Sequence, residues 1–420
     1  MKKILCLVLT LLFVFTMAVG CHDQQTSTTP KASSTSSTTK KTSATSSAPI
    51  VDVWNGSVAT SFAGGSGTST DPYRIKTGAQ LAYVAKQVNS GASNFYGQFL
   101  KLENDLNLNN TAWTPIGNGT HSFAGTFDGA GYTISKLNIT NPNYRKYDGE
   151  KYAYAGLFGS CTQSAIRNLK IQNATVNIPV SPITYEYVYA GILVGHINCI
   201  QRDSISNVRI TNASITVTQK SAYLYAGGCA GYLAAKENSL FEASLLQCKD
   251  IQLTAKENTY YSYLGGLFGR MYIQGSVEFT NFASYCALKY PYNSGTNYGG
   301  AFGSIYKAKG HLKLENAWCV TASQSTYSAS NTHANRTEAI IGVYSQESNQ
   351  GDTLVLRNLY GHVKPHPSGA TFSSPVYSLY FIPASNYTEQ NCEGCFSLPA
   401  NQGLDPLVWD LRVWQEPVLK

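Results

Sequence analysis

The sequence predicts an all-β fold, a parallel β-helix or closely related β-solenoid with one short N-terminal capping helix. Charged residues make up only 13% of the chain, while Gly (36) and Tyr (29) are plentiful, which is typical of β-structure. A short glycine motif recurs at a nearly constant spacing, and an alternating apolar segment follows each copy. Such self-similarity at a fixed period indicates stacked repeats.

The glycine motif first appears as Tyr154-Ala-Gly-Leu-Phe-Gly159 and ends in a glycine in each copy. Successive last glycines are 36, 36, 38, 34 and 39 residues apart. We expect glycine at these places because it permits a tight bend or a close approach of two backbones. The predicted structural repeat glycines are Gly159, Gly195, Gly231, Gly269, Gly303 and Gly342.

The segments that follow the motif have the pattern of half-buried strands. Ile166–Ile171 and Ile205–Ile210 alternate apolar and polar residues and carry Asn in one slot, where stacked Asn side chains can form a hydrogen-bonded ladder. We align Ile134–Ile139 with these segments, and also Leu246–Ile251, with Cys248 in the Asn slot. Without helical crossovers, such strands stack as parallel coils about 4.8 Å apart. A sandwich or propeller is the alternative, which unequal loops over a constant motif disfavour.

The two ends of the folded part have the features of caps. Residues 77–91 predict a helix, with Thr77 as N-cap, Leu81, Val84, Ala85 and Val88 on one apolar face, and Gly91 at the end. A helix there would cover an open sheet edge. We divide the folded chain into a capping segment with the first coils (50–140), solenoid repeats (141–360), and C-terminal coils with a cap (361–420).

The first residues predict export. Residues 1–20 have a positive start and an apolar stretch that is short for a membrane span, as in a signal peptide. Ala18-Val-Gly-Cys21 resembles the lipobox of bacterial lipoproteins, which implies a lipid on Cys21; ordinary cleavage near Gly20 is the alternative. Residues 22–49 contain 16 Ser or Thr, so we expect 21–49 to be a lipid-anchored, disordered tether. The folded part would then face outward at the cell surface.

The rest of the composition excludes several classes of function. From residue 50 onward 26 basic residues oppose 23 acidic ones, which is no nucleic-acid footprint. The carboxylates show no clustered acidic site, and Glu278 and Glu315 do not share a repeat register. His362 and His366 are separated by Pro365, which disfavours a helical metal pair. We therefore predict no catalytic residue, no metal site and no cofactor.

Eight Cys follow Cys21, and most fall at similar points of successive repeats. Stacked, inward-facing small residues explain this spacing without a disulfide framework. Cys392-Glu-Gly-Cys395 is the exception, for which we expect a local disulfide or two free thiols.

The tyrosines form the candidate binding surface. Counted back from the last glycine of the motif, they occupy two registers that are two residues apart, so both lie on one face of a strand. Three coils would then present two parallel columns, suited to sugar rings or a protein partner if exposed, or serving only to stabilise neighbouring strands. The columns consist of Tyr187, Tyr223 and Tyr261, and of Tyr189, Tyr225 and Tyr263.

These motifs resemble the GLUG repeats of bacterial surface proteins. The N-terminal part is similar to the segment that often precedes them, through Gly64–Thr68, Asp71–Ile75, Trp113–Gly117 and Phe123–Gly129. The resemblance covers roughly residues 54–420 and implies a surface-displayed, adhesin-like β-solenoid without assigned catalytic residues. Some relatives carry a metallopeptidase domain, but this chain has no HExxH.

The leading hypothesis is therefore a non-enzymatic lipoprotein that binds a glycan or protein outside the cell or in the cell wall. A carbohydrate-active β-helix enzyme, either a polysaccharide lyase or a glycoside hydrolase, is the first alternative. A structural surface spacer is the second.

Overall fold

The computed structural model describes most of the chain between residues 51 and 364. The chain separates into two units, residues 1–49 and 50–420, and every described residue belongs to the second. The signal, Cys21 and the tether therefore lie outside the described residues. The described ranges are 51–180, 182–255, 261–290, 296–325, 337–338, 340–346, 353–364, 377–379, 392–393, 409–410 and 418–419.

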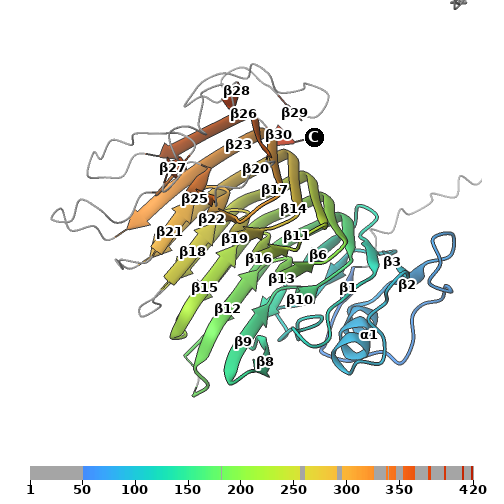
Figure 1. Ribbon diagram of the computed structural model, residues 1–420. Coiled ribbons are helices and arrows are strands. Elements are labelled where there is room, and N and C mark those ends of the chain that lie inside the picture. The colour runs from blue at the N-terminus through green and yellow to red at the C-terminus, as the bar shows by residue number, and fades with distance from the viewer. Residues whose placement is uncertain are drawn as a thin grey trace, which may run out of the picture. The chain divides into compact units, whose positions relative to one another are not determined.

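The predicted β-solenoid is confirmed. Three parallel sheets, here named A, B and C, run along the stack, and each coil passes from C through B to A (Figure 1). Sheet C contains β9 (Glu150–Ala155), β12 (Tyr185–Gly191), β15 (Ser221–Gly227), β18 (Tyr261–Gly265), β21 (Thr296–Gly299) and β24 (Thr337–Glu338). Sheet B contains β10 (Phe158–Cys161), β13 (Val194–Cys199), β16 (Ala230–Ala235), β19 (Phe268–Ile273), β22 (Phe302–Lys307), β25 (Ile341–Gln346) and β27 (Tyr377–Leu379).

Sheet A has the longest strands and receives the N-terminal ones at its first edge. Its long strands are β11 (Ala165–Ile178), β14 (Arg202–Val217), β17 (Leu240–Ala255), β20 (Ser276–Tyr290), β23 (His311–Ser325) and β26 (Thr353–Lys364), followed by β28 (Cys392–Glu393). The N-terminal strands are β1 (Asp52–Val53), β2 (Tyr73–Ile75), β3 (Phe99–Leu102), β4 (Leu106–Asn107), β5 (Thr126–Asp128), β6 (Thr133–Ser135) and β7 (Asn138–Ile139). A separate pair, β29 (Trp409–Asp410) and β30 (Val418–Leu419), is antiparallel.

Asparagine turns the corners of the long strands. In β14, Asn207 and Asn212 have φ of about 50°, and each is a second outward residue in a row, after which the apolar alternation resumes. Asn tolerates this left-handed backbone better than most residues. The side chains stack as predicted: Asn207 Nδ2 donates to Asn168 Oδ1 at 3.0 Å, and Asn212 Nδ2 donates to Asn173 Oδ1 at 2.6 Å.

Two of the repeat alignments were wrong. Cys248 lies in register with the buried Ile210, and the Asn slot of that coil holds Leu245, at a φ of 52°. Ile134 pairs with Ile171 rather than with Ile166, so that segment matches the second Asn slot and not the first. In both cases the register follows from the alternation of buried and exposed residues along the strand. Similarity between individual side chains does not set it.

The repeat glycines allow a close approach of backbones, and none of the six has a left-handed φ. A Cβ atom on any of the five later ones would lie 2.5–2.7 Å from the carbonyl oxygen of the repeat glycine one coil earlier. The first glycine of the motif is equally crowded, since a Cβ on Gly227 would lie 2.1 Å from the Ala230 oxygen. The turn between sheets C and B thus leaves no room for a side chain at these glycine positions.

The first coil is covered by two segments of the N-terminal part. Strand β8 (Asn143–Tyr147) pairs antiparallel with β9 at the edge of sheet C, and residues Ile116 and Phe123 bridge to β10 at the edge of sheet B. Helix α1 (Gly78–Asn89) is the predicted helix; Thr77 caps it by accepting from Gln80 N at 3.2 Å, and its apolar face is buried.

The helix fastens the cap but does not itself pair with an edge strand. The Asn89 side chain donates to Pro115 O at 2.9 Å and accepts from Gly117 N at 2.7 Å. It thereby holds in place the segment that covers β10, which is a more indirect role than the predicted one.

Six of the predicted inward-facing cysteines are buried and free: Cys161, Cys199, Cys229, Cys248, Cys286 and Cys319. They do not form one column, because Cys248 and Cys319 flank Ser284 while Cys286 lies beside Thr321. Burial raises the pKa of the Cys199 thiol to about 12, so it stays protonated and unreactive. The side chains of Cys392 and Cys395 lie outside the described residues.

Candidate functional site

The predicted tyrosine columns exist, and each begins one coil earlier than expected. The outer column is Tyr152, Tyr187, Tyr223 and Tyr261, and the inner column is Tyr154, Tyr189, Tyr225 and Tyr263. Tyr152 and Tyr154 were missed because the turn of the first copy, from Gly156 to Gly159, is one residue shorter than the turn from Gly191 to Gly195. The paired strands, read from the first glycine of the motif, show the true register.

The rings of the outer column are stacked face to face. Successive centroids are 4.8, 4.9 and 5.3 Å apart, with interplanar angles of 5°, 7° and 11°. The faces of the inner rings of this stack are therefore covered by their neighbours. What the column presents outward is ring edges with their hydroxyl groups, because the para hydroxyl is the atom farthest from the backbone. The last ring, Tyr261, is 44% exposed.

The inner column is buried, with every member between 4% and 8% exposed. It lies between the outer column and a third column that projects from sheet B and consists of His196, Tyr232 and Arg270. Tyr189 stacks on His196 at 4.9 Å, and the Arg270 guanidinium lies 4.8 Å from the Tyr263 centroid. Outward faces of sheets B and C thus meet in a concave corner that aromatic rings fill.

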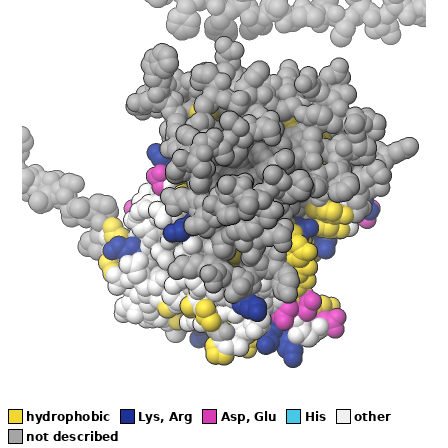
Figure 2. Space-filling model, turned by 90° about the vertical axis from the view of Figure 1, so that its left-hand side faces the viewer, with side chains coloured by type: hydrophobic (Ala, Val, Ile, Leu, Met, Phe, Trp, Pro, Cys, Tyr) yellow, Lys and Arg dark blue, Asp and Glu magenta, His cyan; other side chains and the backbone are white. Residues whose placement is uncertain are grey.

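This arrangement divides the six predicted tyrosines. Tyr187, Tyr223 and Tyr261 remain accessible to a ligand, whereas Tyr189, Tyr225 and Tyr263 are packed like core residues. The structural alternative therefore describes the inner column, and only the outer column offers a surface. Figure 2 looks onto the side of the molecule at the left of Figure 1, where hydrophobic side chains, a class that includes tyrosine, gather in a strip along the right-hand edge.

The outer hydroxyls are hydrogen-bonding groups, and those of Tyr152 and Tyr187 are held neutral. Burial raises the pKa of Tyr152 and of Tyr187, so both phenols stay protonated at physiological pH. Tyr152 Oη donates to Glu150 Oε2. Among the described residues, the Tyr187 and Tyr223 hydroxyls have no protein partner within hydrogen-bond distance. They are free to donate to and accept from a bound molecule.

Two titratable groups of the solenoid are buried, His196 at the corner and Asp203 at the turn from sheet B to sheet A. His196 is enclosed by the aromatic rings, and burial, aided by repulsion from Lys236, lowers its pKa to about 4. Asp203, at the start of β14, is 1% exposed and accepts hydrogen bonds from the backbone and hydroxyl of Ser164 at 2.7 and 2.8 Å. Burial outweighs those bonds and raises the pKa of Asp203 to about 6.

One pair of acidic residues was not predicted from the sequence. Glu242 and Glu278 are in register on neighbouring coils of sheet A, while Glu315 pairs with Thr280. Arg202 contacts Glu242 at 2.6 Å, and His311 lies 4.0 Å from Glu278. The pair thus belongs to a surface network of ion pairs. Within the described ranges, no group of three or more His, Cys, Asp or Glu is placed to hold a metal ion.

Comparison with known proteins gives partial matches. No protein-family model matches the chain. A protein of Evansella cellulosilytica, provisionally named a Gly-rich membrane protein, is 32% identical over 122 residues, which are 29% of this chain and 13% of that protein. Halomucin of Haloquadratum walsbyi is 32% identical over 134 residues, 29% of this chain and 1% of halomucin. The chain therefore spans a small part of the length of either relative.

Among solved structures, a Bacteroides ovatus protein provisionally named an immunoglobulin A1 protease aligns over 68% of this chain and 87% of that one. The identity is 14% and the TM-score is 0.33, which is too low to support an argument. No helix in the described part of the chain is both long and apolar enough to cross a membrane.

Proposed function

We propose that this chain is an exported, lipid-anchored and non-enzymatic module that binds an extended glycan outside the cell. The outer tyrosine column carries the proposal. It repeats one hydroxyl per coil, at a coil spacing of about 4.8 Å, and one sugar residue of an extended polysaccharide is about as long as one coil is high. A glycan lying along the stack would meet an equivalent free hydroxyl at Tyr187, Tyr223 and Tyr261.

The remaining parts of the proposal rest on the sequence. The lipobox-like end of the signal and the Ser/Thr-rich residues 22–49 support display from a lipid on Cys21. The repeats resemble those of GLUG surface proteins, and one curated relative bears the name of a membrane protein. Two or three acyl chains hold a protein stably, where one chain holds it only marginally.

Two alternatives, a glycan-cleaving enzyme and a structural spacer, can be distinguished by experiment. A retaining glycosidase holds two carboxylates about 5 to 5.5 Å apart, a spacing near that of neighbouring coils, so Glu242 and Glu278 are the residues to test for the enzyme. Their ion pairs with Arg202 and His311 fit a structural network better than an acid and a nucleophile. A spacer would bind nothing.

The test is a glycan array probed with the full-length protein in detergent, with reducing-end release assayed in parallel. Removing two of the free hydroxyls by Tyr187→Phe with Tyr223→Phe keeps the stacked rings. Because a neutral hydrogen bond contributes about 0.5–1.5 kcal/mol, we expect binding of an extended glycan to weaken about tenfold.

The matched control is Tyr96→Phe with Tyr132→Phe, which removes two exposed hydroxyls from the N-terminal cap. Equal binding by the test and control variants would refute the tyrosine surface. Release of reducing ends that stops in Glu278→Gln would favour the enzyme, and binding to an extracellular protein alone would refute the glycan.

A further inference from the structure

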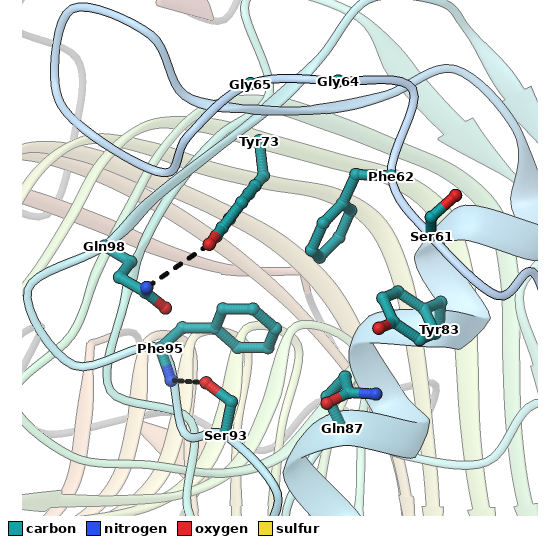
Figure 3. A pocket seen from close by; sticks show the side chains of 10 residues that line it. All are labelled: Ser61, Phe62, Gly64, Gly65, Tyr73, Tyr83, Gln87, Ser93, Phe95 and Gln98. Carbon is teal, nitrogen blue, oxygen red and sulfur yellow. Dashed lines mark hydrogen bonds between the residues drawn. The ribbon is translucent and has the colours of Figure 1, made fainter.

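The N-terminal cap contains a pocket of about 380 Å³ that is separate from the tyrosine columns. Helix α1, the loop before β2 and the loop before β3 surround it (Figure 3). Ligand pockets commonly have volumes of about 300–1,000 Å³, so this one is of the size for a small molecule.

Aromatic rings form most of the wall. Phe62 stacks on Tyr73 with centroids 4.6 Å apart and an interplanar angle of 19°. Tyr83 and Phe95 each meet the Phe62 ring edge-on, at 5.2 and 5.9 Å. Since each ring is held by the others, the wall is rigid before any ligand enters, which reduces the entropic cost of binding.

The loop before β3 is held in an unusual conformation at the pocket. Phe95 has a φ of 61°, a left-handed value that is rare for a bulky aromatic residue. Ser93 Oγ accepts from Phe95 N at 3.1 Å, and Phe95 O accepts from Gln98 N at 2.9 Å. Strained residues of this kind cluster at sites where a side chain must be held in one place.

Polar groups without protein partners point into the same space. Figure 3 shows the Tyr83 hydroxyl and the Gln87 amide on the helix side of the pocket. Neither has a hydrogen bond from its side chain to another described residue. Across from them, Gln98 Nε2 lies 3.5 Å from Tyr73 Oη, a contact long enough to be replaced. The pocket therefore offers amide and hydroxyl groups beside flat apolar faces.

The lining carries no Asp, Glu, Lys, Arg or His. The guanidinium of Arg74 lies beside Gly64 of the lining and is paired with Asp71 at 3.5 Å. A charged ligand would lose hydration without gaining an ion pair, whereas a sugar ring presents one apolar face for an aromatic ring and hydroxyls for amides.

We propose that this pocket binds one ring of an uncharged sugar, as a second site independent of the outer tyrosine column. Phe62 and the Tyr83 ring contact the ring faces or edges of the sugar, and Gln87, Gln98 and the Tyr83 hydroxyl hydrogen-bond to the sugar hydroxyls. A site in the N-terminal cap would hold one end of a glycan or a separate glycan unit.

The experiment uses the full-length protein in detergent, with glucose, galactose, mannose and N-acetylglucosamine as probes. Glucosamine and glucuronate serve as charged counterparts. Saturation-transfer NMR detects binding, and calorimetry measures Kd. We expect at least one neutral sugar to bind, and Gln87→Ala with Tyr83→Phe to weaken it about tenfold, since two hydrogen bonds are lost.

The matched control is Gln252→Ala with Tyr132→Phe, at exposed positions outside the pocket, which should bind as the parent does. Melting curves show whether each variant is folded. Absence of binding by all four neutral sugars overturns the proposal, as does equal binding of the charged counterparts or an unchanged Kd in a folded test variant. Retained binding in the variant with Tyr187→Phe and Tyr223→Phe separates this site from the one proposed on the columns.

Discussion

Adding one methyl group at Gly231 tests the reason for the repeat. A Cβ there would lie 2.6 Å from Ala190 N, 2.7 Å from Gly195 O and 2.8 Å from Tyr225 O. All three atoms are backbone, so relief requires two coils to move apart. Overpacking typically costs about 1–3 kcal/mol, and the loss of chain entropy in the unfolded state offsets about 0.4–1 kcal/mol. We expect Gly231→Ala to lower the free energy of unfolding by about 1 kcal/mol.

The assay is urea unfolding followed by circular dichroism, with hydrogen exchange to show where protection is lost. Neighbouring coils stabilise one another in a solenoid, so the loss should centre on β13, β16 and β19. The control is Gly131→Ala, where a Cβ meets nothing within 4 Å but φ is 83°, so the only cost is backbone strain of about 1 kcal/mol, which the same entropy term largely offsets. A smaller cost at Gly231 than at Gly131 would refute the close-approach argument.

Three further predictions concern Leu245, Cys21, and the pair of His196 and Asp203. Leu245→Asn should stabilise the fold by about 1 kcal/mol in urea unfolding, because Asn relieves the left-handed strain and joins the Asn ladder. Cys21→Ser should move the protein from the membrane fraction to the medium, as seen by fractionation; unchanged anchoring would refute the lipid. Stability of the chain should depend on His196 and Asp203 in opposite directions between about pH 4 and 6. Urea unfolding of His196→Phe and Asp203→Asn across this range checks that opposition.

The signs of those two effects follow from where each proton is bound. His196 has its pKa lowered to about 4, so the unfolded chain takes the proton first and stability is lost as pH falls from about 6.5 to 4. Asp203 has its pKa raised to about 6, so its contribution is lost as pH rises from about 4 to 6. Each is worth about 3 kcal/mol at most. In His196→Phe, the free energy of unfolding should decrease as pH rises from about 4 to 6. In Asp203→Asn, it should increase over the same range.

The solenoid was predictable because its rule is local. The crowded repeat glycine recurs once per coil, and the alternation of apolar and polar residues after it can be read directly from the sequence. The register of β17 was not predictable, because Leu245 adopts a left-handed backbone conformation for which leucine has no preference. The same holds for Tyr152 and Tyr154, where a turn shortened by one residue shifts the count.

The burial of the inner column depends on an angle between two sheets, which no single strand encodes. Whether outward side chains at Tyr189 and His196 point apart or meet is decided by the turn between β12 and β13. The cap pocket is likewise formed by segments 61–65, 83–87 and 93–98, which alternate with elements that pack elsewhere. The pattern within one segment predicts which of its faces is buried. It does not predict which distant segments come into contact.

The crowded turn connects the stability of the fold to its surface. Since the glycines of the motif bring sheets B and C close together, the aromatic side chains just before and after each turn are pressed into the concave corner. Changes at Tyr189 or Tyr225 must therefore cost core packing, while changes at Tyr187 or Tyr223 reach only ring edges and hydroxyls. A ligand surface can vary freely on the outer column alone, which makes that column the place where specificity for a glycan would be set.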